Sequence, residues 1–389
     1  MIQFIHDSDK QLFQNAMAFA RTQVRRLVEN YPDFYPMYTV AGKWKHEGPA
    51  WTHWCDGFLP GMMWTFARHL GRQPVANGTG ALSQPEYKFW FERAIHYSKP
   101  LEYRKSDNDV HDLGFIFLST YHPWFKLTRD NAVKEVMLQA GRTLAQRFNE
   151  GGQYLSSFVA RDSLFIDIMM NVGIIFYAAR ETNDKRLRDI AVRHCITTRR
   201  SLVRGDGSVA QEGLFDLESG EFLRQTTHQG FRGDSCWSRG LTWALYGFSN
   251  AYEYSRDPRF LQTAEACADY YITHTPANGV PPWDYNAPVE NRSLLDSSAA
   301  AIAAAGLLKL CRQIADPMKG HFYWSTAVYV LRNLCNDFLA INEPEWEGIL
   351  KGGVYHIHKG LGIDESVMWG EYFFVEALEA TLKVIAPSK

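Results

Sequence analysis

The six cysteines of this chain form no C-x-x-C pair, and lysine and arginine nowhere gather into a run. Isolated cysteines within apolar helical patterns are typical of reduced core thiols, so a disulfide framework and a zinc site are not expected. A formal net charge of -2 without a basic patch argues against nucleic acid as a partner. The H-E-x-x-H, G-x-S-x-G, Walker and G-x-G-x-x-G motifs are also absent, so no metal or cofactor is implied.

The chain also lacks a segment that would direct it to a membrane. Its first ten residues show neither the basic start nor the apolar stretch of a secretory signal, so we expect a cytoplasmic protein. The longest apolar stretch is interrupted by an aspartate and an asparagine, and it is shorter than the roughly 18 clean residues that span a bilayer. We therefore expect no membrane association. The sequence does not choose between a monomer and a homodimer.

Helical periodicity is the dominant pattern that is present. The chain has 389 residues, of which 46% are hydrophobic, and this is ample material for a core. Apolar residues at steps of three and four predict twelve helices. They lie near 8–30, 57–71, 83–98, 112–127, 130–149, 163–181, 184–203, 236–255, 258–274, 296–314, 321–339 and 366–385. Asp130, Asp184 and Asp257 each precede an amphipathic helix and are expected to cap it.

The predicted helices alternate in character. Some are apolar on nearly every face, such as 164–177, whereas others have one polar face, such as 184–203. This alternation predicts an inner ring of buried helices inside a half-solvated outer ring. We therefore predict an all-α fold, an (α/α)6 barrel or toroid of six hairpins, in which residues 1–389 form a single catalytic domain. An open α-solenoid is the alternative, but it needs a more regular repeat than this chain has.

The longer linkers predict where binding residues gather. Residues 204–235 are rich in glycine and contain candidate strands near Val209 and Phe222, which predicts a short β-hairpin over one mouth of the barrel. Loops clustered at one mouth are where binding residues concentrate. Further linkers, rich in Trp, Pro, Gly and His, are 31–56, 275–295 and 342–365.

Two aspartates lie in strongly apolar surroundings. Asp167 is almost the only charge within residues 164–177, and Asp112 lies in a similar setting at 111–117. A carboxylate buried without partners shifts its pKa or takes part in chemistry, and paired acids favour proton transfer. We therefore predict Asp167 and Asp112 as the catalytic residues, with Asn171 on the same helix face bonding the carboxyl of Asp167. The alternative is that each aspartate caps a helix or pairs with an arginine in the core.

Aromatic residues make up 14% of the chain, with 12 tryptophans. Indoles in a cleft stack on sugar faces, so Trp54 and Trp369, at junctions of loops and helices, favour a carbohydrate pocket. Arg239 and Trp243 are four residues apart on one helix and are expected to face the same pocket. An arginine there can grip a carboxylate with two parallel hydrogen bonds. The alternatives are core packing for the indoles and a structural acid as the partner of Arg239.

Nine short motifs follow one another between about residues 50 and 380. They are Trp54-Cys55-Asp56-Gly57-Phe58, His111-Asp112-Leu113-Gly114-Phe115, Ile166-Asp167, Leu202-Val203-Arg204-Gly205-Asp206, Thr227-His228-Gln229-Gly230, Trp237-Ser238-Arg239-Gly240, Trp283-Asp284, Asp296-Ser297-Ser298-Ala299 and Trp369-Gly370-Glu371-Tyr372. Together they resemble the unsaturated glucuronyl hydrolases. The resemblance implies a six-hairpin α/α barrel and an enzyme that releases a 4,5-unsaturated glucuronic acid from the non-reducing end of lyase-generated oligosaccharides.

The resemblance also implies roles for individual residues. Family enzymes hydrate the vinyl ether of the unsaturated sugar, so Asp167 is expected to protonate C4 and then to activate the water that attacks C5. Asp112 is expected to be its essential partner and, with His111, to serve positioning and charge balance. The implied substrate contacts are Trp54 and Trp243 for stacking, and His228, Gln229, Arg239 and His356 for polar groups. Where many relatives carry a pocket histidine, this chain has Gln211, which is expected to bind the substrate by a hydrogen bond but cannot be cationic.

Three other functions are considered at this point. Rhamnogalacturonyl hydrolases share the barrel and the hydration chemistry, and they differ in the sugar beyond the cleaved bond. A sugar 2-epimerase on a similar toroid would use a pair of histidines. A non-catalytic sugar-binding protein would keep the tryptophans and the arginine without needing Asp167. The expected partner in the main interpretation is an unsaturated uronyl oligosaccharide.

Overall fold

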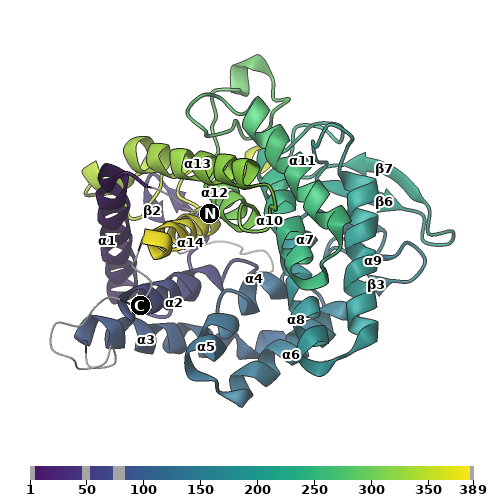
Figure 1. The fold of residues 1–389 in the computed structure, drawn as a ribbon, viewed down its shortest axis with the longest axis horizontal. Coiled ribbons are helices and arrows are strands. Elements are labelled where there is room, and N and C mark those ends of the chain that lie inside the picture. The colour runs from purple at the N-terminus through teal and green to yellow at the C-terminus, as the bar shows by residue number, and fades with distance from the viewer. Residues whose placement is uncertain (1–4, 46–52, 73–83, 386–389) are drawn as a thin grey trace.

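Helices account for most of the protein, and the strands are few and short (Figure 1). The computed structural model describes residues 5–45, 53–72 and 84–385. The helices are α1 (Asp7–Asn30), α2 (Phe58–Leu70), α3 (Pro85–Ser98), α4 (Leu113–Phe117), α5 (Tyr121–Thr128), α6 (Asn131–Ala145), α7 (Ile168–Asn171), α8 (Gly173–Thr182), α9 (Lys185–Leu202), α10 (Ser238–Ser255), α11 (Pro258–His274), α12 (Ser297–Leu310), α13 (Pro317–Asn333) and α14 (Met368–Ile385). The strands are β1 (Thr39–Val40), β2 (Lys43–Trp44), β3 (Phe148–Asn149), β4 (Tyr154–Leu155), β5 (Ser163–Phe165), β6 (Glu212–Phe215), β7 (Phe222–Thr226), β8 (Gly353–His356) and β9 (Leu361–Glu365).

The helices form two concentric rings, which confirms the predicted all-α barrel (Figure 1). The inner ring consists of α2, α4 with α5, α7 with α8, α10, α12 and α14. The outer ring consists of α3, α6, α9, α11, α13 and α1, each packed on an inner partner. The first helix, α1, packs on the last, α14, and α14 packs on α2, so the ring closes and an open solenoid is rejected. The inner helix α12 is buried on nearly every face, since Lys309 is its one residue that is not buried.

One predicted inner helix, 112–127, is wrong in detail because it is interrupted. Helix α4 ends at Phe117, and α5 begins only at Tyr121. The hydroxyls of Ser119 and Thr120 bond to carbonyl oxygens of the preceding turn and so compete with the helical backbone bonds. Pro123 also lacks the N–H that would continue the ladder.

A second predicted inner helix, 163–181, is wrong at its start. Residues Ser163–Phe165 form strand β5, and the helix begins only after Asp167. A short continuous apolar run fits a buried strand and a buried helix equally well, so periodicity could not separate the two.

Other bounds differ by smaller amounts. The helix predicted at 130–149 ends at Ala145, and the one predicted at 321–339 begins earlier, at Pro317, where Asp316 accepts a hydrogen bond from Met318 N. The start predicted at residue 83 lies outside the described residues. The three predicted caps are confirmed, since Asp130, Asp184 and Asp257 each accept hydrogen bonds from the first turn of the following helix.

The predicted β-hairpin is present, although one strand is displaced. Strands β6 and β7 form it, and β5 adds a third strand, whereas Val209 makes only an isolated bridge with Val203. A second hairpin, β8–β9, precedes α14. Among the described residues, no helix has the length and apolar character needed to cross a bilayer.

Helices α4 and α7 meet backbone to backbone at Gly114. A Cβ on Gly114 would lie 2.4 Å from Cα of Asn171 and 2.6 Å from its carbonyl oxygen. Asn171 adds two hydrogen bonds, because its Oδ1 accepts from Phe115 N at 2.7 Å and its Nδ2 donates to the carbonyl oxygen of Asp167 at 3.1 Å. The predicted bond from Asn171 to the carboxyl of Asp167 is therefore wrong. Asn171 instead joins the two turns that carry the predicted acids.

We predict that Gly114→Ala destabilises the protein by about 1–3 kcal/mol, because the added methyl group overpacks a backbone contact that has no side chain to move. Thermal unfolding measures the effect. Gly205→Ala is the matched control, since no atom lies within 4 Å of its added Cβ. Equal melting temperatures for the two variants would contradict the proposed contact.

Candidate active site

A cavity of about 710 Å³ opens where α4, α7 and α10 begin. It is lined by Trp54, His111, Asp112, Phe115, Phe158, Val159, Phe165, Asp167, His228, Gln229, Arg239, Tyr355, His356, His358 and Lys359. Eight of the twelve predicted site residues are in this set: Trp54, His111, Asp112, Asp167, His228, Gln229, Arg239 and His356. The other four, Asn171, Gln211, Trp243 and Trp369, lie behind the lining.

Asp167 stands immediately before α7 and reaches the cavity with part of its side chain. Its Oδ2 is buried and has no hydrogen-bond partner among the described residues. Burial raises the pKa of Asp167 to about 6, against the opposing effects of the Arg239 charge, its own backbone and the nearby indole of Trp243. The carboxyl group can therefore both hold and release a proton close to neutral pH.

Asp112 stands immediately before α4 and is buried beside His111. Nδ1 of His111 accepts a hydrogen bond from Phe158 N at 3.0 Å, and its Nε2 lies 3.3 Å from Oδ1 of Asp112. Burial lowers the pKa of His111 to about 3, so the ring is neutral and carries its one proton on Nε2. That proton faces Asp112 and orients its carboxylate.

Arg239 is a buried cation near Asp167. Its guanidinium donates to the carbonyl oxygens of Val354 and Tyr355 and to Oε1 of Gln229. Oδ2 of the buried Asp296 lies 3.8 Å from Nη1, so a structural acid accompanies this arginine. Both hydrogens of Nη2 are engaged, and a two-pronged grip on a substrate carboxylate would require these bonds to be exchanged. The contribution that this arrangement supports directly is electrostatic.

The two other predicted indoles are fully buried. Trp369 donates to Oγ of Ser298 at 3.0 Å and packs beneath Trp54, with ring centroids 4.8 Å apart. Trp243 packs against Phe115, with ring centroids 5.1 Å apart. Neither borders the cavity, so both support the residues that do. Trp54 is the predicted indole that a sugar could reach.

Gln211 also lies behind the cavity wall. Its Oε1 accepts three hydrogen bonds, from Thr227 Oγ1 at 2.6 Å, His228 N at 2.7 Å and Gln229 N at 2.7 Å. Gln211 was predicted to bind the substrate, but its carbonyl oxygen is used in these three internal hydrogen bonds. Gln211 shapes the turn that carries His228 and Gln229.

Several residues of the site were not predicted from the sequence. Phe158, Val159 and Lys359 line the cavity mouth, and their sequence surroundings carry no motif that marks them. Glu212 is buried and pairs with His228, whose Nε2 lies 3.0 Å from its Oε2. The sequence signal for Glu212 was an acid at one end of a short apolar strand. That signal did not reveal the pairing, because His228 is 16 residues away in the chain.

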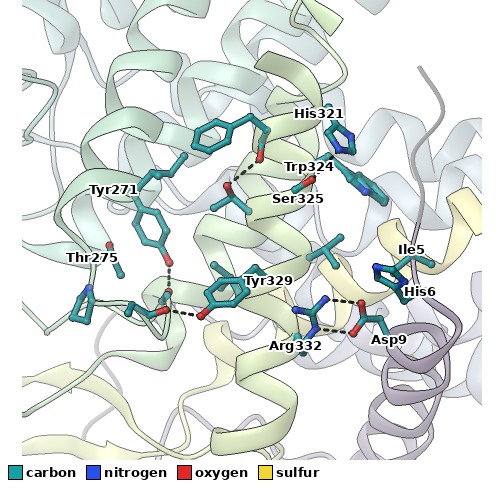
Figure 2. Close-up of a pocket in the computed structure, with 18 residues that line it drawn as sticks. Ile5, His6, Asp9, Tyr271, Thr275, His321, Trp324, Ser325, Tyr329 and Arg332 are labelled. Carbon is teal, nitrogen blue, oxygen red and sulfur yellow. Dashed lines mark hydrogen bonds and ion pairs between the residues drawn. The ribbon is translucent and has the colours of Figure 1, made fainter. Parts of the chain in front are cut away.

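A second cavity, of about 670 Å³, lies in the outer ring between the start of α1 and helices α11 and α13 (Figure 2). Asp9 is the single acid among its lining residues, and it is held by two hydrogen bonds of 2.7 Å from Arg332. This cavity lacks a pair of acids. The described residues also contain no cluster of three or more metal-ligand side chains.

The barrel and its acid-lined pocket, with an arginine and aromatic rings around the acids, are the arrangement expected of a glycoside hydrolase. The family model for Glycosyl Hydrolase Family 88 matches residues 29–313, most of the chain. The protein belongs to this family, and it is an enzyme. The sugar 2-epimerase and the non-catalytic binding protein therefore lose their support.

Relatives of known name agree with this assignment. The unsaturated glucuronyl hydrolase of Bacillus sp. (strain GL1) is 29% identical to this chain, covering 94% of this chain and 96% of that protein. The unsaturated glucuronyl hydrolase of Formosa agariphila is 30% identical, covering 92% of this chain and 87% of that protein. A solved structure, of an unsaturated glucuronyl hydrolase specific for heparin, matches with a TM-score of 0.86 at 28% identity, covering 96% of this chain and 98% of that one.

We predict that Asp167→Asn raises the melting temperature above pH 6 and has little effect near pH 4. The folded state favours the protonated acid, so this favourable contribution is present at low pH and is lost as pH rises through about 6. The raised pKa of Asp167 corresponds to at most about 3 kcal/mol of unfolding free energy, and solvent contact at the cavity reduces this value. Thermal unfolding across pH measures the difference. Asp109→Asn, at an exposed position, is the control. A difference in melting temperature between Asp167→Asn and the wild type that does not change with pH would contradict the prediction.

Proposed function

We propose that the protein releases a 4,5-unsaturated glucuronic acid from the non-reducing end of an oligosaccharide by hydrating the C4=C5 double bond. The observation that carries the proposal is one cavity that holds a carboxyl group with a pKa of about 6, Asp167, together with a second buried acid, Asp112. The names of the relatives at 29% and 30% identity support the substrate class.

In the proposed reaction, protonated Asp167 transfers its proton to C4, and positive charge develops at C5 and the ring oxygen. Water then adds to C5 while the Asp167 carboxylate takes its proton, so the acid is regenerated. The resulting hemiketal opens to a ketone as the bond from C5 to the ring oxygen breaks. The freed hydroxyl on C1 then expels the leaving sugar, and the net reaction consumes one water.

The neighbours of Asp167 support this proton cycle. Asp112 supplies negative charge where positive charge develops on the sugar, and the neutral His111 holds its carboxylate in place. Arg239 opposes the effect of burial on Asp167 and so keeps the acid able to ionise for the second half of the cycle. Trp54, partly exposed at the cavity wall, offers a ring face to the sugar.

The rhamnogalacturonyl hydrolase alternative differs only in the leaving sugar. The hydration chemistry needs the same two acids, so the acids do not separate the alternatives. Single-domain organisation, a cytoplasmic location and the choice between monomer and homodimer stay predictions.

We predict that incubation with an unsaturated uronyl disaccharide removes the ultraviolet absorbance of its conjugated double bond. A panel of glycosaminoglycan, ulvan, gellan, xanthan and rhamnogalacturonan disaccharides identifies the leaving sugar. Asp167→Asn should lower kcat by about 10²–10⁴-fold, as expected for loss of a general acid and base, while disaccharide affinity is kept. Asp189→Asn, on the outer helix α9, is the control. Absorbance that persists across the whole panel would refute the proposed function.

We also predict that kcat/KM falls as pH rises through about 6. The first step needs the proton on Asp167, and that proton is lost above its raised pKa. The profile should decline with the slope of a single proton, and initial rates at constant ionic strength measure it. A constant kcat/KM across this range would rule out Asp167 as the proton donor.

A further inference from the structure

The mouth of the cavity holds a histidine whose ring is paired with a buried acid. His228 follows β7, and its side chain is 48% exposed, whereas the side chain of Glu212 in β6 is 3% exposed. Nε2 of His228 lies 3.0 Å from Oε2 of Glu212. The other carboxylate oxygen of Glu212 accepts a hydrogen bond from the hydroxyl of Ser163 in β5. Both oxygens are therefore held, and one of them is directed at the imidazole.

The backbone at His228 is held by Gln211, the residue that precedes Glu212 in the chain. Gln211 Oε1 accepts from the backbone nitrogens of His228 and Gln229, both at 2.7 Å. The imidazole also packs on Phe165, with ring centroids 5.5 Å apart. Since Nε2 faces Glu212, Nδ1 is the ring nitrogen that remains to meet a ligand, and no described residue bonds to it.

The charges around His228 favour its cationic form. The hydrogen bond with Glu212 raises the pKa of His228, while burial and the charge of Lys359 oppose the rise. His356 also faces this region from β8, but burial lowers its pKa to about 4, so it is neutral at physiological pH. Glu212 is thus the group that favours a positive charge on His228.

We propose that Glu212 holds His228 as a fixed imidazolium, and that this cation binds an anionic substituent, a sulfate or a carboxylate, on the leaving sugar. The inference rests on the proposed function, which places the unsaturated sugar beside Asp167 and Asp112. His111 at the buried end has a 3% exposed side chain, whereas that of His228 is 48% exposed. His228 therefore lies at the solvent end, where the next sugar of the chain emerges. Glu212 is a positioning residue, and His228 makes the contact.

The first experiment measures the charge of His228 directly, by NMR titration of its ring in the free protein. Glu212→Gln keeps the shape of the side chain and removes its charge, so the pKa of His228 should fall. Glu218→Gln, exposed at the tip of the same hairpin, removes an equal charge and should leave that pKa unchanged. An unchanged pKa in Glu212→Gln would overturn the proposal.

The second experiment measures affinity by calorimetry in the Asp167→Asn background, where the ligand is not consumed. The probes are two unsaturated disaccharides that differ only in a sulfate on the leaving sugar, and a third that carries a carboxylate there. Glu212→Gln should weaken binding of the two probes with an anionic leaving sugar about tenfold, the order of a lost charge-assisted hydrogen bond, and should affect the probe with an uncharged leaving sugar much less. Equal losses on all three probes, or none, would overturn the proposal.

The outcomes separate this inference from the proposed function. If the wild type consumes none of the probes but Asp167→Asn protein binds those with an anionic leaving sugar through Glu212, the proposed function fails and the anion site stands. If turnover occurs and the anionic group makes no difference, the inference fails alone. His228→Gln is the second variant, in case Glu212→Gln does not fold, and it should abolish the same preference.

Discussion

The contact between α4 and α7 is the constraint on which the rest of the site depends. Asp112 and Asp167 stand before two different helices, 55 positions apart in the chain, and they share a cavity because these helices touch at Gly114. Asn171 makes that contact specific, since a carboxamide can accept from one backbone and donate to the other at once. The glycine permits the close approach, and the asparagine holds it.

Burial shifts the pKa values of the acid and of the histidines at the site in opposite directions. The same removal from water raises the pKa of Asp167 to about 6 and lowers the pKa of His111 to about 3 and that of His356 to about 4. Each group is pushed toward its neutral form, which makes the acid a proton donor and leaves the histidines uncharged. Arg239 limits this effect for Asp167. Because burial disfavours the ionised form of Asp167, this residue lowers the stability of the folded protein at neutral pH. The proposed chemistry requires an acid of this kind at that place.

Much of the barrel could be predicted from periodicity, because a helix that packs on one face repeats its apolar residues every three or four positions. The aspartate caps could also be predicted from the sequence, since a capping aspartate is recognised by its position directly before an amphipathic helix. The predictions failed at Ser163–Phe165, where a buried strand and a buried helix have the same composition. They also failed for Gln211, Trp243 and Trp369, which were expected in the pocket and instead lie behind the cavity wall. Asn171 was expected to bond the carboxyl of Asp167 and instead bonds its backbone carbonyl oxygen.

By itself, the sequence determined the class of fold, and its local patterns and ordered motifs predicted the two acids and most of the residues that line the cavity with them. The tertiary structure decided which of these side chains reach the cavity and which hold its wall. Only the tertiary structure shows that Glu212 pairs with His228 and that Asn171 bonds at the starts of both α4 and α7. Glu212 and His228 are 16 positions apart in the chain, and Phe115 and Asn171 are 56 apart, so only the packing of one strand or helix against another brings each pair within hydrogen-bond distance.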